Sequence, residues 1–191
     1  MKKVNPPKPS IIVFRYRKPK LISFCNCFVP PHGYEFVTVD YWGTARSSVG
    51  NNVKRTDTLY LMKTKFEIPW VVTNLPVTGF PDSVGRGAAA RYGGLPKKFG
   101  CYGRAYIEVD SSVDFLNKLE IGNARKFTAD QFGHHFNIYW EDSLKSFFSK
   151  EETHYNQIEQ VKEFLTPKIS EKMKTAYDVR VTQIIIENTN Y

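Results

Sequence analysis

The stretch Thr58-Leu59-Tyr60-Leu61-Met62-Lys63-Thr64-Lys65-Phe66, followed after Pro69 by Trp70-Val71-Val72-Thr73, carries a strong β-pattern. Its β-branched and aromatic residues suit a pleated sheet, and Pro69 predicts an interruption between two strands. Similar runs bounded by Pro and Gly predict further strands at Ile11–Tyr16, Leu21–Phe28, Tyr34–Tyr41 and Cys101–Val109. The chain is therefore expected to be rich in strands before residue 110.

The helical signals lie after residue 110. Ser111 and Asp114 resemble a capping box ahead of a helix over Val113–Leu119, and Gly122 closes that helix. A second, amphipathic helix is predicted from about Glu152 to Leu165, because four apolar residues there have helical spacing: Ile158, Val161, Phe164 and Leu165.

The end of the chain adds a short helix and a strand. Pro167 is expected to break or restart the preceding helix, and Ile169 and Met173 have the spacing of one more short helix. A final strand places two side chains on one face, Arg180 and Thr182, and four on the other: Tyr177, Val179, Val181 and Ile185. Strands first and helices later predict an α+β fold, mainly antiparallel sheet (sandwich or barrel-like) with helices in the C-terminal half.

The charge of the chain is unevenly distributed. The net charge of the 191 residues is +8, but residues 1–20 hold seven Lys or Arg and no acid, and residues 83–104 hold five. The chain therefore divides into a basic, proline-containing arm at residues 1–20 and a single globular domain at residues 21–191. Such basic segments attract anions, whether phosphate backbones, anionic lipid or small carboxylates.

Several classes of protein are disfavoured by what the chain lacks. Cys25, Cys27 and Cys101 do not have the spacing of a metal site, so reduced cysteines in an intracellular, cytoplasmic protein are expected. His134 and His135 are adjacent and would diverge on a strand, so no metal or other cofactor is predicted. No apolar run approaches the ~20 residues that a membrane-spanning helix needs, and no membrane partner is expected.

A basic segment in the middle of the chain has the residues of a reactive amine site. It reads Tyr92-Gly93-Gly94-Leu95-Pro96-Lys97-Lys98-Phe99-Gly100. A lysine becomes a nucleophile when its ammonium form is destabilised by an apolar pocket or by a second cation, and this segment can supply both. A solvated basic turn has the same composition, and the segment alone does not exclude it.

The order of residues around these lysines resembles that of the acetoacetate decarboxylases. In that family a Gly-Arg pair and a short spacer precede Pro-Lys-Lys, as Gly85-Arg86 precedes Pro96-Lys97-Lys98 here, with a longer spacer. Glu108-Val109-Asp110-Ser111 and Leu119-Glu120-Ile121-Gly122 look like the following strand and turn, and Tyr34-Glu35-Phe36-Val37 lies near the place of a glutamate-bearing strand. The similarity covers roughly residues 34–140, and a second family glutamate has no counterpart.

The resemblance implies a Schiff-base lyase that decarboxylates a β-keto acid or a related small carbonyl acid. Lys97 would form the imine, Lys98 would be the nearby cation, and Glu35 would orient the substrate or assist proton transfer. The candidates for binding the anionic substrate are Arg86, Arg91 and Arg104. A homo-oligomer without a cofactor is expected.

The alternative is a non-enzymatic, structural protein that binds nucleic acid, such as a small viral coat protein, located in the virion, or a ribosome-associated protein. Cations follow phosphates while aromatic rings stack on bases. The candidate residues are Lys2, Lys3, Lys8, Arg15, Arg17, Lys18, Lys20, Tyr92 and Tyr102. A plain folded domain with a solubilising arm is a third possibility.

Overall fold

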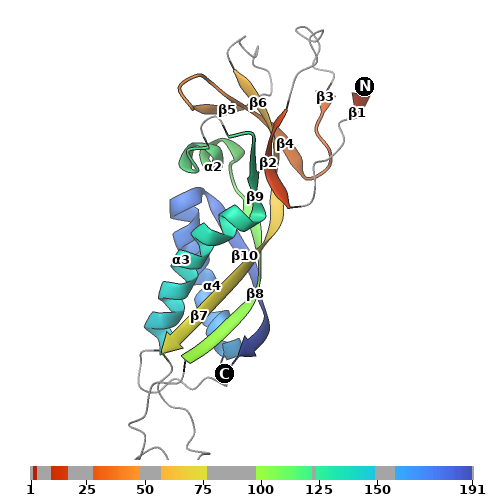
Figure 1. Cartoon of the computed structure of the whole chain (residues 1–191). Helices are drawn as coiled ribbons and strands as arrows, with labels where there is room; N and C mark the ends of the chain where they lie inside the picture. Colours follow the sequence, from red (N-terminus) through yellow and green to blue (C-terminus); the bar gives the residue numbers. More distant parts are fainter. Residues whose placement is uncertain are drawn as a thin grey trace, which may run out of the picture.

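The computed structural model describes residues 2–3, 10–16, 28–47, 57–76, 98–121, 124–148 and 158–190. The elements in these residues (Figure 1) are, in chain order, β1 (Lys2–Lys3), β2 (Ile11–Tyr16), β3 (Phe28–Val29), β4 (Tyr34–Val39), β5 (Ala45–Ser47), β6 (Thr58–Lys63), β7 (Lys65–Pro76), β8 (Lys98–Val109), α2 (Ser112–Lys118), β9 (Lys126–Thr128), α3 (Ala129–Phe148), α4 (Ile158–Tyr177) and β10 (Val179–Asn190).

Two antiparallel sheets follow one another along the molecule (Figure 1). The upper sheet has five strands in the order β5-β4-β6-β2-β9, and the lower sheet has three in the order β10-β8-β7. β1 and β3 form a separate parallel pair. Helices α3 and α4 cover one face of the lower sheet (Figure 1). The predicted α+β fold, mainly antiparallel and with its described helices after residue 110, is confirmed, and neither sheet closes into a barrel.

The predicted interruption between strands lies at Thr64, where the chain passes from one sheet to the other, and not at Pro69. The Thr64 N–H donates to the carbonyl oxygen of Gly33 in the upper part, and its own carbonyl accepts from Val109 of the lower sheet. Pro69 lies inside β7, which is an edge strand. A proline is tolerated there because the N–H that it lacks has no partner strand to reach.

Each described helix supplies one polar side chain that hydrogen-bonds an edge strand. Edge strands carry unpaired backbone groups that would otherwise attract another chain. The three contacts are Asn117 of α2 with the N–H of Ala45 (2.6 Å), Asn137 of α3 with both backbone groups of Val71, and Ser170 of α4 with the N–H of Val181 (3.0 Å). The helices therefore position the sheets as well as covering them.

Helix α3 was not predicted from the sequence, although its signals are local. Thr128 and Gln131 form a capping box, in which each side chain accepts a hydrogen bond from the backbone N–H of the other residue. Four fully buried apolar side chains follow at every fourth position: Phe132, Phe136, Trp140 and Leu144. They pack on the inner face of β7, where Trp70 and Trp140 meet edge to face at 5.5 Å.

The capping prediction at Ser111 is confirmed, because its side chain accepts from the N–H of Asp114 at 3.2 Å. The helix ends at Lys118, and Glu120 takes the left-handed conformation with φ 49°. Gly122, predicted to close the helix, lies outside the described residues, as do residues 21–27 and 152–157 of other predicted elements.

Two predictions near the C-terminus are wrong. Pro167 does not break the chain into two helices, because α4 runs through it while Leu165, Ile169 and Met173 bury one face. A β-bulge between Val181 and Gln183 shifts the pattern of β10 by one residue, so Ile184 is buried in place of Ile185. Tyr177 ends α4 and does not begin the strand.

The segment assigned to the basic arm contributes a strand to the upper sheet. β2 lies between β6 and β9, and Ile12 and Val13 are buried. The boundary after residue 20 stays a prediction. Among the described helices, none combines the length and the apolar character that crossing a bilayer requires.

Candidate functional site

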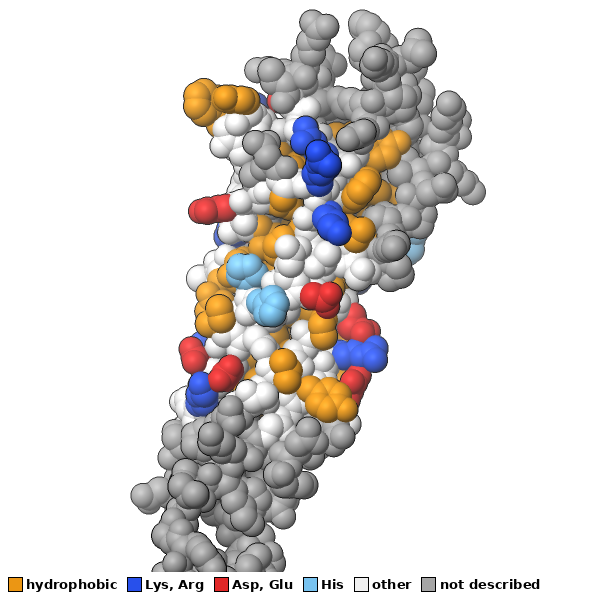
Figure 2. All heavy atoms as spheres, viewed as in Figure 1, with side chains coloured by type: hydrophobic (Ala, Val, Ile, Leu, Met, Phe, Trp, Pro, Cys, Tyr) orange, Lys and Arg blue, Asp and Glu red, His pale blue; other side chains and the backbone are white. Residues whose placement is uncertain are grey.

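The turn between β4 and β5 holds two aromatic side chains in solvent. The Asp40 carboxylate accepts hydrogen bonds from the backbone N–H groups of Trp42 and Thr44, both at 2.9 Å. Gly43 completes the turn with φ 84°, a conformation that favours glycine. Tyr41 and Trp42 are 80% and 86% exposed, and their rings meet edge to face at 5.5 Å. Figure 2 shows an apolar projection where this turn lies in Figure 1.

Two arginines lie side by side, Arg15 on β2 and Arg125 directly before β9. The Arg15 N–H donates to the carbonyl of Arg125 at 2.9 Å, and the next pair in register is Phe14 with Lys126. Both arginines are exposed. In the part of the chain that the structure describes, neither they nor Lys126 form an ion pair. Like charges at opposing positions of paired strands destabilise a sheet, so this arrangement favours a bound anion.

Arg15 also affects a buried tyrosine, Tyr60. The Tyr60 hydroxyl donates to the carbonyl of Ala124 at 2.9 Å, next to Arg125. Burial raises the pKa of Tyr60, and the charge of Arg15 opposes that rise. Arg15 and Tyr60 pair in register on β2 and β6, so their side chains lie on the same face of the upper sheet.

The aromatic turn and the two arginines share one end of the upper sheet. Tyr16 ends β2 and pairs with Leu59, which also pairs with Thr38 two residues before the turn begins. Arg15 is level with Val37 through Tyr60, three residues before Asp40. With about 4.8 Å between strands and about 3.3 Å per residue along them, Arg15 and Arg125 lie about 14 and 17 Å from Asp40. Figure 2 shows Lys and Arg side chains grouped over the upper sheet on the displayed face. Cations and aromatic rings thus lie within reach of one extended ligand.

A wide, open groove of about 900 Å³ lies between the lower sheet and α3. Arg104 lines this groove, but its positive charge is compensated by carboxylates. Arg104 forms ion pairs with Glu67 at 2.8 Å and with Glu187 at 2.5 Å. These carboxylates raise the pKa of Arg104, first through the hydrogen bond that the Arg104 guanidinium donates to Glu67. Asp130 adds a further carboxylate to the groove. Because two carboxylates already pair with the Arg104 guanidinium, the groove does not favour the binding of an anion there.

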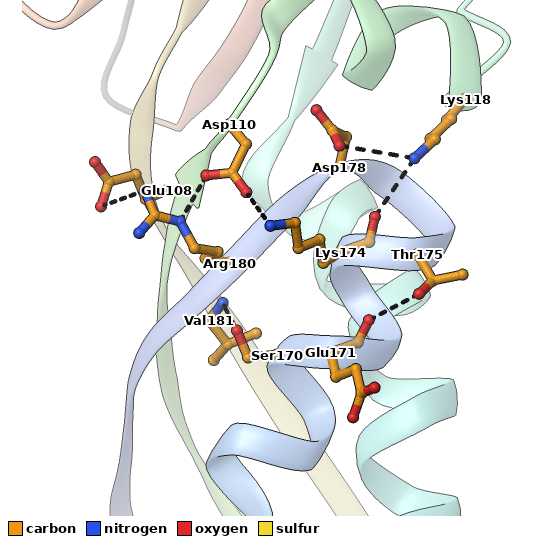
Figure 3. Close-up of polar contacts among 10 residues, drawn as sticks. All are labelled: Glu108, Asp110, Lys118, Ser170, Glu171, Lys174, Thr175, Asp178, Arg180 and Val181. Atoms are coloured by element: carbon orange, nitrogen blue, oxygen red, sulfur yellow. Dashed lines mark hydrogen bonds and ion pairs between the residues drawn. The ribbon is translucent and has the colours of Figure 1, made fainter.

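The cations at the junction of α4 and β10 are compensated in the same way (Figure 3). Asp110 accepts from the Arg180 side chain at 2.5 Å and lies 3.6 Å from the Lys174 ammonium. The contacts at this junction also include Arg180 with Glu108 at 3.8 Å and Lys118 with Asp178 at 3.8 Å. The network ties α2, β8, α4 and β10 together, and it leaves these charges neutralised.

The structure does not bring Glu35 and Lys98 together. Glu35 accepts a 2.5 Å hydrogen bond from Ser112, which lies three residues beyond the end of β8. Lys98 begins β8 at the opposite end of this 12-residue strand, about 36 Å away at 3.3 Å per residue. Lys97 lies outside the described residues.

The other predicted site residues are divided between described and undescribed parts. Tyr102 is 40% exposed and lies on β8, on the same face as Arg104. Lys2 and Lys3 are the two residues of β1. Those outside the described residues are Lys8, Arg17, Lys18, Lys20, Arg86, Arg91 and Tyr92.

His134 and His135 lie on helix α3, not on a strand. His135 shares a hydrogen bond with the Tyr177 hydroxyl at 2.9 Å. Burial lowers the pKa of His135, and the neighbouring His134 lowers it further. No group of three or more His, Cys, Asp or Glu that could hold a metal ion occurs in the described ranges.

Sequence reasoning missed Tyr41, Trp42 and Arg125 as candidate site residues. Tyr41 was predicted as the last residue of a strand. Asp40 and Gly43, three residues apart, are nevertheless the residues that indicate a turn. Arg125 carries no local signal, because its neighbour Arg15 is distant along the chain. Comparison with protein-family models gave no match, and comparison with the curated proteins gave none.

Proposed function

We propose that this chain is a non-enzymatic nucleic-acid-binding protein that holds a phosphate backbone at Arg15 and Arg125. The observation that carries the proposal is the adjacency of these two exposed arginines across a pair of strands, without a carboxylate partner among the described residues. Planar guanidinium forks bind phosphate oxygens in pairs, and a phosphate between them would remove their mutual repulsion.

The distribution of compensated charge supports the same choice. Three cations on the strands of the lower sheet, Lys65, Arg104 and Arg180, are ion-paired. Arg17, Lys18 and Lys20 follow β2 in the sequence, so further cations lie close to Arg15 along the chain.

The test is the salt dependence of oligonucleotide binding, measured by fluorescence anisotropy. For a single-stranded ligand, each phosphate contact that is removed reduces the slope of log affinity against log salt concentration by about 0.7 in magnitude. Replacing Arg15→Gln together with Arg125→Gln should therefore reduce the slope by about 1.4. The control variant, Lys65→Gln with Arg104→Gln, removes the same charge from ion-paired positions and should leave the slope nearly unchanged. Equal effects of both variants, or no binding by the wild type, would contradict the proposal.

The decarboxylase-like activity stays a second proposal, favoured by the order Pro96-Lys97-Lys98 in the sequence. Borohydride added with a β-keto acid should trap the ligand on Lys97, and Lys97→Ala should abolish trapping. Lys98→Gln should move the activity profile to higher pH, because the nucleophile loses the neighbouring cation that lowers its pKa. Trapping that persists in Lys97→Ala would exclude this residue as the nucleophile. A homo-oligomer remains a prediction that light scattering would test.

A further inference from the structure

We infer that the Asp40–Thr44 turn is a base-stacking site, at which Tyr41 and Trp42 receive unpaired bases of the strand whose phosphates bind Arg15 and Arg125. This inference rests on the proposed function. It adds that the ligand is single-stranded, because bases in a duplex are already stacked on one another and do not offer a free face.

The turn is held firmly enough to serve as a support. Besides the two hydrogen bonds to its carboxylate, Asp40 donates its backbone N–H to the carbonyl of Thr44 and accepts from the N–H of Gly43, both at 3.0 Å. Arg46 forms a 3.2 Å ion pair with Asp40. The aromatic residues therefore sit on a closed loop whose backbone is ordered before any ligand binds, which lowers the entropic cost of binding.

The two rings are presented together and face solvent. Apart from each other, neither ring has an aromatic partner in the described parts of the chain, and both are more than three-quarters exposed. Of the other exposed apolar side chains, Ile138 carries no ring, and the Phe164 ring already contacts Phe147 at 5.8 Å and the Lys168 ammonium at 3.8 Å. Adjacent exposed rings are the element with which proteins bind bases regardless of sequence.

The surroundings favour a base over a lipid surface or a protein groove. The Arg46–Asp40 pair neutralises the carboxylate of the turn, so the turn does not repel the phosphates that flank a base. The uncompensated arginines lie about 14 and 17 Å from the start of the turn, where the same nucleic-acid strand can place phosphates. An extended polymer that alternates flat bases with phosphates matches both features.

The experiment compares two strands of equal length, oligo(dT) and an abasic strand that keeps the phosphates but lacks bases. The wild type is compared with Trp42→Ala, with Arg15→Gln/Arg125→Gln, and with Ile138→Ala as a control that removes an exposed apolar side chain elsewhere. Anisotropy gives the affinities. Tryptophan emission gives an independent readout, because Trp42 is exposed whereas Trp70 and Trp140 are 2% and 0% exposed.

Trp42→Ala should weaken oligo(dT) binding by about five-fold or more and leave abasic-strand binding unchanged. Oligo(dT), but not the abasic strand, should quench the emission of the wild type, and Ile138→Ala should behave as the wild type. Thermal melting of Trp42→Ala should match the wild type, because the side chain is exposed.

Three results would overturn the inference in distinguishable ways. If Trp42→Ala binds oligo(dT) as the wild type does while the arginine variant loses both strands, the stacking site is wrong and the proposed function stands. If no strand binds, the proposed function fails and the inference fails with it. If vesicles of phosphatidylcholine and phosphatidylserine shift the Trp42 emission and oligo(dT) does not, the turn contacts membrane and not bases.

Discussion

Replacing Gly133→Ala tests how closely α3 lies on β7. An ideal Cβ at residue 133 would lie 2.6 Å from the carbonyl oxygen of Pro69, well inside ordinary contact, which begins at 3.4 Å. The obstacle is backbone, so it cannot rotate away. It is also fixed between Ile68 and Trp70, whose side chains are 0% and 2% exposed.

Two opposing effects set the magnitude. Helix propensity alone predicts that alanine stabilises α3 by about 1 kcal/mol relative to glycine. Relief of the clash requires a shift of about 0.8 Å, the difference between 3.4 and 2.6 Å, and such a gap forfeits a quarter to a half of each dispersion contact that it opens. Overpacking against fixed groups costs about 3 kcal/mol at the upper end of its range. We expect a net loss of about 2 kcal/mol in the free energy of unfolding.

Thermal and urea unfolding measure this loss, which should lower the melting midpoint by about 4–8 °C in a chain of this size. Gly100→Ala is the matched control, since its Cβ would lie 3.5 Å from Val72 O in ordinary contact, and it should be nearly neutral. Gly103→Ala, whose Cβ would lie 1.9 Å from Ile185 O, should prevent folding. A Gly133→Ala protein that is more stable than the wild type would refute the reasoning, because propensity would then outweigh packing.

Three further predictions follow from buried or constrained groups. Because the pKa of His135 is lowered from 6.5, the folded state resists protonation more than the unfolded chain, so stability should fall as the pH drops below 6.5. His135→Gln should remove that part of the pH dependence in thermal melts. Burial raises the pKa of Cys101 to about 12, so in a Cys25→Ser/Cys27→Ser background thiol reagents should label Cys101 only as the protein unfolds. Pro167→Ala should stabilise the protein by about 2 kcal/mol in urea unfolding, because it restores a hydrogen-bond donor within α4.

Each of these predictions has an outcome that would contradict it. Identical pH profiles for the wild type and His135→Gln would show that this histidine is not desolvated. Labelling of Cys101 at the rate of a free thiol would show that the buried face of β8 opens without unfolding. Loss of stability in Pro167→Ala would mean that the proline shapes α4 to fit the lower sheet.

Local signals in the sequence were sufficient for several elements. The strands β2, β4, β6 and β8 follow from runs of β-branched and aromatic residues, and the start of α2 follows from Ser111 and Asp114. Helix α3 had equally local signals in Thr128, Gln131 and the residues after them, so it could have been predicted. In these segments the preference of the backbone agrees with the burial that the fold requires.

The two prolines show where local rules were overridden. Pro69 and Pro167 each lie inside an element that sequence reasoning interrupted at them. Whether a proline interrupts a strand depends on the strand's position in the sheet, and whether it interrupts a helix depends on the apolar face buried on either side. Both conditions are set by distant residues, so neither can be predicted from the segment itself.

The candidate site was predicted only in part for the same reason. The sequence by itself determined that Arg15 belongs to a basic segment and that the first half of the chain forms strands. Only the tertiary structure placed Arg125 against Arg15, neutralised Arg104 between Glu67 and Glu187, and held Glu35 far from Lys98. Strand formation depends on neighbours along the chain, whereas compensation of a charge depends on groups that strand order brings together across the sheet.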